Sequence, residues 1–224
     1  MKREVDFNEI SDGNLYGPND MVKADCGDCK GCSACCQNMG ESIVLDPFDI
    51  YRLTKGLNLS FEALLEDKIE LNVFDGMILP NLKMAGENES CAFLNEEGRC
   101  SVHRIRPGIC RLFPLGRFYE NGDFQYFLQI HECKNENRTK VKVKKWIDTP
   151  DLKQNDKFIL AWHDFVEDIQ KKMMSASDDE LFKKVNMFLL QQFYMERYHE
   201  EDFYAQFEER LAKAKTVVDT LMKI

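Results

Sequence analysis

Hydrophobic side chains recur at helical spacing throughout the C-terminal part of the chain. Apolar residues three and four positions apart, separated by polar ones, give each of three segments a single apolar face. The last 91 residues contain one proline and no glycine, so little in them would interrupt a helix. We therefore predict three amphipathic helices that pack through their apolar faces. The three stripes are Ile159, Trp162, Val166, Ile169 and Met173; Leu181, Val185, Phe188, Leu189 and Phe193; and Phe203, Phe207, Leu211, Ala214, Val218 and Leu221.

Shorter elements are predicted in the first half of the chain. Asp46 can cap a helix that begins with Pro47 and ends near Gly56. Ser60 precedes a second helical stretch, FEALLEDKIEL. The following region, 73–88, has no sustained period, which is typical of a strand fragment with loops.

Two β-hairpins are predicted between the cysteines of the second half. Residues 91–103 read as two short strands about an Asn-Glu-Glu-Gly turn, and residues 113–130 as a hairpin about Asn121-Gly122. Together with the helices, they predict a mainly α fold with short β-hairpins, an α+β fold stapled by metal. We expect an N-terminal arm at 1–25, a cysteine-cluster domain at 26–133, and a helical layer at 134–224 packed against it. Whether that layer belongs to the same domain is open.

Composition narrows the class of protein. With 224 residues and 44% hydrophobic side chains, the chain can bury one substantial core. Its net charge of −9 argues against nucleic acid as a partner. The sequence has neither a long uncharged apolar run nor a signal-peptide pattern, so we expect a cytoplasmic protein with no membrane span. An unidentified protein partner or substrate, and the oligomeric state, stay open.

The cysteines carry the chemistry that this compartment allows. Five of the nine stand within eleven residues, in the run CGDCKGCSACC from Cys26 to Cys36. Disulfides between such close neighbours would be strained, and a reducing cytosol favours free thiols. Thiolates are soft donors for zinc and iron, and CxxC spacing lets a turn bring two sulfurs to one metal. The run therefore predicts a metal site.

The cysteine pattern resembles that of the YkgJ-like cysteine-cluster family, whose members are described as chelating zinc or iron through a CxxCxxCC signature. The likeness covers about residues 26–133 and includes CAFLNEEGRCSVHRIRPGICRLFP, with its Arg-Pro and Phe-Pro pairs. Cys26 lies outside the signature and is the weakest candidate ligand. The resemblance implies eight metal ligands: Cys29, Cys32, Cys35, Cys36, Cys91, Cys100, Cys110 and Cys133.

Eight cysteines fit two four-thiolate sites, or one cluster with spare thiols. Successive side chains usually diverge, so we expect Cys35 and Cys36 to serve different metals, or one of them to lie outside the coordination sphere. Both zinc and an iron-sulfur cluster suit such donors. The ferredoxin pattern is incomplete, because its final CxxxCP is missing. His103 and His131 lie near Cys100 and Cys133 and could each replace a thiolate.

A local excess of positive charge accompanies the cysteines. Between Gly98 and Tyr119 there is no Asp, Glu or Lys, although the chain is acidic. Two interpretations are open: the guanidinium groups compensate the charge of a thiolate-bound metal, or they bind a phosphate or carboxylate. The arginines are Arg99, Arg104, Arg106, Arg111 and Arg117.

Three functions are consistent with this sequence, which carries no recognisable catalytic motif. The first is a metal-binding protein whose activity is unassigned. The second rests on resemblance to flagellin lysine methylases, which implies an S-adenosylmethionine-dependent protein-lysine methylase. The third is an iron-sulfur protein that transfers electrons.

Overall fold

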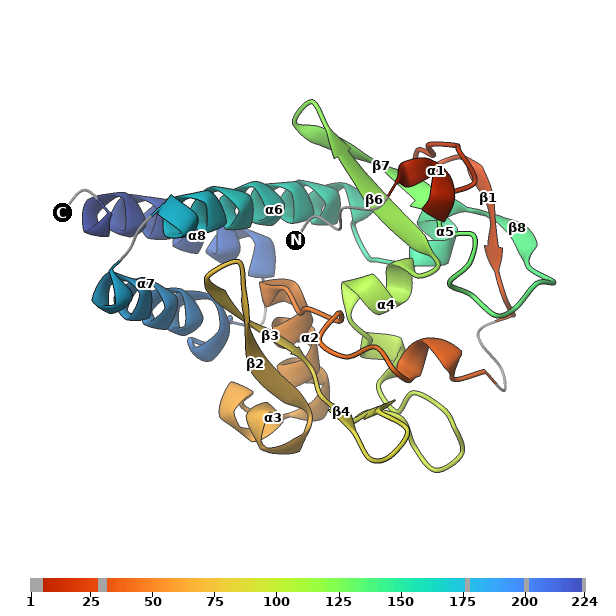
Figure 1. Cartoon of the computed structure of the whole chain (residues 1–224), viewed down its shortest axis with the longest axis horizontal. Helices are drawn as coiled ribbons and strands as arrows, with labels where there is room; N and C mark the ends of the chain where they lie inside the picture. Colours follow the sequence, from red (N-terminus) through yellow and green to blue (C-terminus); the bar gives the residue numbers. More distant parts are fainter. Residues whose placement is uncertain (1–5, 28–31, 176–177, 200–201, 223–224) are drawn as a thin grey trace. The chain divides into compact units, whose positions relative to one another are not determined.

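The computed structural model describes residues 6–27, 32–175, 178–199 and 202–222 (Figure 1). The chain forms two compact units, each built from two separate stretches. Val44–Lys83 and Ala161–Ile224 form one unit, called here the helical unit, and Lys2–Ile43 and Met84–Leu160 form the other. The eight cysteines among the described residues all belong to this second unit, called here the cysteine unit.

The predicted fold class is confirmed, since the chain is 47% helical and its strands form short antiparallel pairs. The predicted domain boundaries at residues 25 and 133 stay predictions.

Helix α2 (Pro47–Leu57) opens the helical unit as predicted. The Asp46 carboxylate accepts from the amide of Asp49, and the Asp49 carboxylate accepts from the amide of Asp46, which makes a capping box. The helix ends at Asn58, whose φ of 53° is left-handed. Helix α3 (Phe61–Asp67) follows, capped by Ser60. Both predicted helices are confirmed, although α3 is shorter than expected.

The predicted continuation of the second helix to Leu71 is wrong. Strand β2 (Ile69–Phe74) pairs residue by residue with β3 (Met77–Leu82) across a turn at Asp75-Gly76. Both turn residues have positive φ, 48° and 82°, a geometry that suits a tight hairpin. Pairing with β3 overrides the helical preference of the preceding sequence. The strand fragment predicted within residues 73–88 is confirmed by β3, which forms a hairpin with β2 where part of the loops was expected.

Three C-terminal helices are present as predicted. They are α6 (Leu152–Ser175), which begins in the cysteine unit and ends in the helical unit, α7 (Asp179–Leu190), and α8 (Phe203–Leu221); a π-helical turn, η3 (Gln191–Met195), follows α7. Thirteen of the sixteen predicted stripe residues are buried, and Leu181, Phe188 and Leu221 are half-buried. Aromatic rings dominate this core: the centroid of Trp162 lies 5.0 Å from that of Phe193, which lies 5.9 Å from Phe207.

Helix α7 lies beside the β2–β3 hairpin (Figure 1). A buried asparagine joins the two elements. The Asn186 carboxamide oxygen accepts from the Ile78 amide at 2.7 Å, and its nitrogen donates to the Gly76 carbonyl at 3.0 Å. The side chain thereby satisfies two backbone groups at the hairpin turn that would otherwise be buried without partners.

The cysteine unit begins with a segment that is hydrogen-bonded to the rest of the unit. Helix α1 (Phe7–Ile10) leads to strand β1 (Met21–Asp25), which pairs antiparallel with β8 (Thr139–Lys142). Strands β6 (Leu115–Glu120) and β7 (Asp123–Leu128) form a hairpin, and the backbone of Tyr16 pairs with that of Tyr126 in β7. The predicted turn at Asn121-Gly122 is confirmed, with φ values of 53° and 74°.

One hydrophobic cluster holds these strands together. It includes Val22 from β1, Tyr126 from β7, and Ile147 from the short helix α5 (Val143–Ile147). Trp146 packs against the cluster, and its indole nitrogen donates to the carbonyl of Phe113 at 3.1 Å. The buried members are Val22, Ala24, Leu112, Leu115, Tyr126, Leu128, Val143 and Ile147.

The hairpin predicted at residues 91–103 is formed only in part. The chain reverses at the Asn-Glu-Glu-Gly turn as predicted: one antiparallel bridge joins Leu94 to Cys100, and the Ser101 amide donates to the Phe93 carbonyl. Strand β5 (Ser90–Cys91) instead pairs with β4 (Met84–Ala85). The segment contains too few residues on each side of its Asn-Glu-Glu-Gly turn to build a longer ladder once Cys91–Leu94 curls into a turn. Within the described ranges, no helix combines the length and apolar character needed to cross a bilayer.

Gly76 tests how tightly the hairpin packs. A Cβ atom there would lie 2.5 Å from the Phe182 ring, whereas one at Gly86 would meet nothing within 4 Å, and both residues have positive φ. We expect Gly76→Ala to cost about 3 kcal/mol, because backbone strain and overpacking add, and Gly86→Ala about 1 kcal/mol. Amide exchange in the unit that carries each substitution measures both values. Equal costs would contradict the tight contact.

Candidate metal centre

The cysteine-bearing segments have little hydrophobic core of their own. Within residues 26–27 and 32–42, every described side chain is exposed or half-buried. In residues 84–110 the buried ones are Cys91, Phe93, Val102 and Pro107. The hydrophobic cluster lies instead with the strands β1, β6, β7 and β8. The cysteines therefore occupy the part of the unit where apolar burial contributes least.

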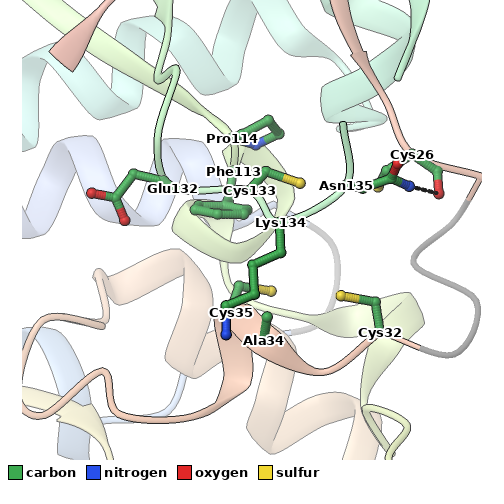
Figure 2. Close-up of a pocket in the computed structure, with 10 residues that line it drawn as sticks. All are labelled: Cys26, Cys32, Ala34, Cys35, Phe113, Pro114, Glu132, Cys133, Lys134 and Asn135. Carbon is green, nitrogen blue, oxygen red and sulfur yellow. Dashed lines mark hydrogen bonds between the residues drawn. The ribbon is translucent and has the colours of Figure 1, made fainter. Parts of the chain in front are cut away.

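Four cysteines from three chain segments line one cavity of about 40 Å³ (Figure 2). Cys26 follows strand β1, Cys32 and Cys35 belong to the segment around the 3-10 turn η1 (Ala34–Cys36), and Cys133 follows β7. In Figure 2 the sulfur atoms of Cys32 and Cys35 turn toward each other. The remaining lining residues are Ala34, Phe113, Pro114, Glu132, Lys134 and Asn135.

Another set of cysteines surrounds Cys36. The charges of Cys35, Cys91 and Cys100 all raise the pKa of the Cys36 thiol, which is therefore near the other three. Cys36 also donates a hydrogen bond to Cys35, and this bond and burial contribute most to the rise. The cysteines of distant segments thus converge around two neighbouring residues, Cys35 and Cys36.

Cys35 is the thiol with the lowest resolved pKa in the described chain, at about 7. The hydrogen bond from Cys36 lowers its pKa most, a backbone hydrogen bond and the positive charge of Arg106 lower it further, and burial opposes them. Cys100 differs: burial raises its pKa, although Arg106 and Arg99 act in the opposite direction. At neutral pH Cys35 is therefore the residue most ready to act as a thiolate.

Arg106 connects the arginine-rich segment between Gly98 and Tyr119 with the thiols. Its Nη1 lies 2.9 Å from Nε2 of His103. Since guanidinium only donates, Nε2 accepts this bond and its lone pair is engaged. Arg106 and Arg99 act on Cys100 and Cys35 by charge, which agrees with the charge-compensation interpretation. Ligation by His103 or His131 stays a prediction.

Arg111 has a different role from the other arginines. Its side chain is 6% exposed, and its guanidinium donates to three backbone carbonyls, those of Arg104, Arg106 and Asp148. These bonds attach helix α4 (Gly108–Leu112) to the turn η2 (His103–Ile105) and to the end of α5. Arg111 is a structural link, so the anion-binding interpretation does not apply to it.

The structure places the predicted ligands as follows. Cys32, Cys35 and Cys133 share the cavity with Cys26, the residue that sequence reasoning ranked last. Cys36, Cys91 and Cys100 lie near Cys35, Cys110 lies on α4, and Cys29 falls outside the described residues. In the described part of the chain, no three Cys, His, Asp or Glu side chains stand as a ready group for a metal. The ligand set stays a prediction. The CxxC spacing of Cys26 and Cys29 was the available signal for Cys26.

The donor chemistry nevertheless fits a metal. Cysteines are the ligands that zinc and iron-sulfur clusters prefer, and here they converge beside arginines that offset their charge. The fold and site therefore define a cysteine-rich metal-binding class of protein. Residues 28–146 match the model of the CxxCxxCC family, described as a "putative zinc- or iron-chelating domain", and the chain belongs to this family. Neither the curated proteins nor the solved structures contain a match.

Arg111→Met tests the structural link. The substitution keeps an apolar stem but leaves three carbonyls without their donor, so we expect a loss of about 3 kcal/mol in the unfolding free energy of the cysteine unit. The exposed Arg104 provides the matched control, because Arg104→Met leaves its backbone carbonyl in place. Amide exchange in β6 and β7 reports the stability. Similar losses in both variants would argue against a special role for Arg111.

The ionisation of Cys35 can be measured by alkylation of the metal-free, reduced chain. We expect its rate to rise with pH around a midpoint near 7, since the thiolate is the reactive form. Cys36→Ala should shift the midpoint toward the ordinary value of 9.0, and Arg106→Met should shift it less, because the hydrogen bond outweighs the charge. Mass spectrometry of the peptide that contains Cys35 gives the rates. A larger shift for Arg106→Met would reverse that ranking.

Proposed function

We propose that this protein binds zinc or iron through thiolates of its cysteine unit, and that the bound metal holds the cysteine-bearing segments folded. The main support for this proposal is the contrast, within the cysteine unit, between the hydrophobic cluster and the cysteine-bearing segments. Cysteines from distant segments converge where the described residues 26–27 and 32–42 contribute no buried side chain. Such segments gain little from apolar burial, so another interaction must offset their conformational entropy.

Metal coordination supplies that interaction. Bonds to thiolates contribute folding free energy directly, because a complete site does not exist in the unfolded chain. The residues that would hold the metal are the cysteines around Cys35 and Cys36. Arg106 lies where it lowers the thiol pKa of Cys35 and offsets negative charge, which favours the deprotonated donors.

The proposal leaves the choice between zinc and an iron-sulfur cluster open, and it places the protein in the cytoplasm. The donor set suits tetrahedral zinc and an iron-sulfur cluster equally, and the metal is decided by elemental analysis. Free thiols persist in a reducing cytoplasm, where we place the protein. The methylase and electron-transfer hypotheses stay predictions, since no feature of the structure favours either of them.

Removal of the metal should loosen one part of the cysteine unit selectively. We expect chelation to increase amide exchange at least tenfold in residues 34–42 and 84–110, because these segments lose their main crosslinks. Exchange in β6, β7 and α8 should change little, since hydrophobic packing holds them. Hydrogen-exchange mass spectrometry with and without chelator measures both.

Elemental analysis of anaerobically purified protein completes the test. Zinc, or iron with acid-labile sulfide, should be present in stoichiometric amount. Protein that contains none of these and binds none after reduction would refute the metal-binding proposal. Bound metal whose removal leaves exchange unchanged would refute its structural role alone.

A further inference from the structure

Cys26 precedes the residues matched by the family model, yet the fold holds it beside Cys133. Strand β1 ends at Asp25, which is paired with Thr139 of β8. The next residue, Cys26, accepts a hydrogen bond through its backbone oxygen from Nδ2 of Asn135 at 3.4 Å. Two attachments therefore keep the end of β1 near the segment that follows β7.

The cavity joins Cys26 to a defined subset of the family's cysteines. Among the residues that the structure describes, the cysteines that line it are Cys26, Cys32, Cys35 and Cys133 (Figure 2). Four thiolates are the number that a tetrahedral zinc site or one iron-sulfur cluster requires. A volume of about 40 Å³ is sufficient for an ion, since a water molecule needs about 10–15 Å³ by the same kind of measure.

Cys36 lies outside this set, although its thiol donates a hydrogen bond to Cys35. It does not line the cavity, and its surroundings include Cys91 and Cys100. Cys35 and Cys36 are therefore the point at which the two groups of cysteines meet.

We propose that Cys26 is a metal ligand, and that with Cys32, Cys35 and Cys133 it forms one four-thiolate site, distinct from a second site that contains Cys36. The inference rests on the proposed metal-binding function. It extends the ligand set beyond the family signature and assigns the adjacent cysteines to different metals.

The charges around the cavity are compatible with this site. Four thiolates around a divalent ion leave two net negative charges, and Lys134 on the lining supplies a positive group. Glu132 also lines the cavity, but Figure 2 shows its carboxylate directed away from the four sulfur atoms. The described side chains do not yet stand as a ligating group, so metal binding must bring the four sulfurs closer together.

Titration of the reduced, metal-free full chain with Co²⁺ tests the assignment, because cobalt-thiolate absorption counts occupied sites. We expect two equivalents for the unsubstituted chain and one for Cys26→Ser. Two double variants test whether the adjacent residues Cys35 and Cys36 serve different sites. Cys26→Ser combined with Cys35→Ser should still bind one equivalent, since both substitutions remove the same site. Cys26→Ser with Cys36→Ser should lose both sites.

Cys26→His controls for folding, because imidazole can replace a thiolate as a ligand. It should retain two equivalents, with helical circular dichroism unchanged. Two equivalents bound by Cys26→Ser would overturn the role of Cys26 while leaving the proposed function intact. A single equivalent for the unsubstituted chain would overturn the two-site division. No cobalt binding by any form would refute the metal-binding function itself.

Discussion

The buried guanidinium of Arg111 connects the loop between Cys100 and Cys110 to the end of helix α5, and so to the hydrophobic cluster of the cysteine unit. Arg111 donates to carbonyls of Arg104 and Arg106 on one side and to the Asp148 carbonyl on the other. The first two belong to the loop between Cys100 and Cys110, and Asp148 ends helix α5, whose apolar residues belong to the hydrophobic cluster. A positive charge that is 6% exposed must be fully hydrogen-bonded, so its three acceptors have to be brought together.

Beyond that link, the unit is stabilised by two different kinds of interaction. The strands β1, β6, β7 and β8 are held by ordinary apolar packing. The segments that carry most cysteines are half-exposed, and they place thiols close together, where burial and neighbouring cysteines raise the pKa of Cys36 and favour its neutral form in the absence of a cation. These segments bury little apolar surface. The same arrangement suits a metal, because soft sulfur donors are gathered there.

The helical unit shows how buried polar groups specify a fold. Asn186 bonds both sides of the β2–β3 turn, and Arg210 donates to carbonyls of Gln192, Glu196 and Arg197 around the π-helical turn η3. The Arg210 guanidinium also stacks 3.8 Å from the centroid of Tyr198, whose pKa is raised mainly by burial. These contacts satisfy backbone groups that helix ends leave open. No candidate ligand lies in this unit.

The sequence by itself determined the helices, the Asn121-Gly122 hairpin, and the metal chemistry. Helical periodicity, helix caps, turn residues and CxxC spacing are local signals, and each acts over a few residues. Only the tertiary structure decided that Ile69–Leu71 forms a strand, because its pairing with β3 outweighs local preference. It also decided that Arg111 is a structural link, because its guanidinium reaches the carbonyl of Asp148, 37 residues further along the chain. Cys26 shares a cavity with Cys133 because β1 pairs with β8.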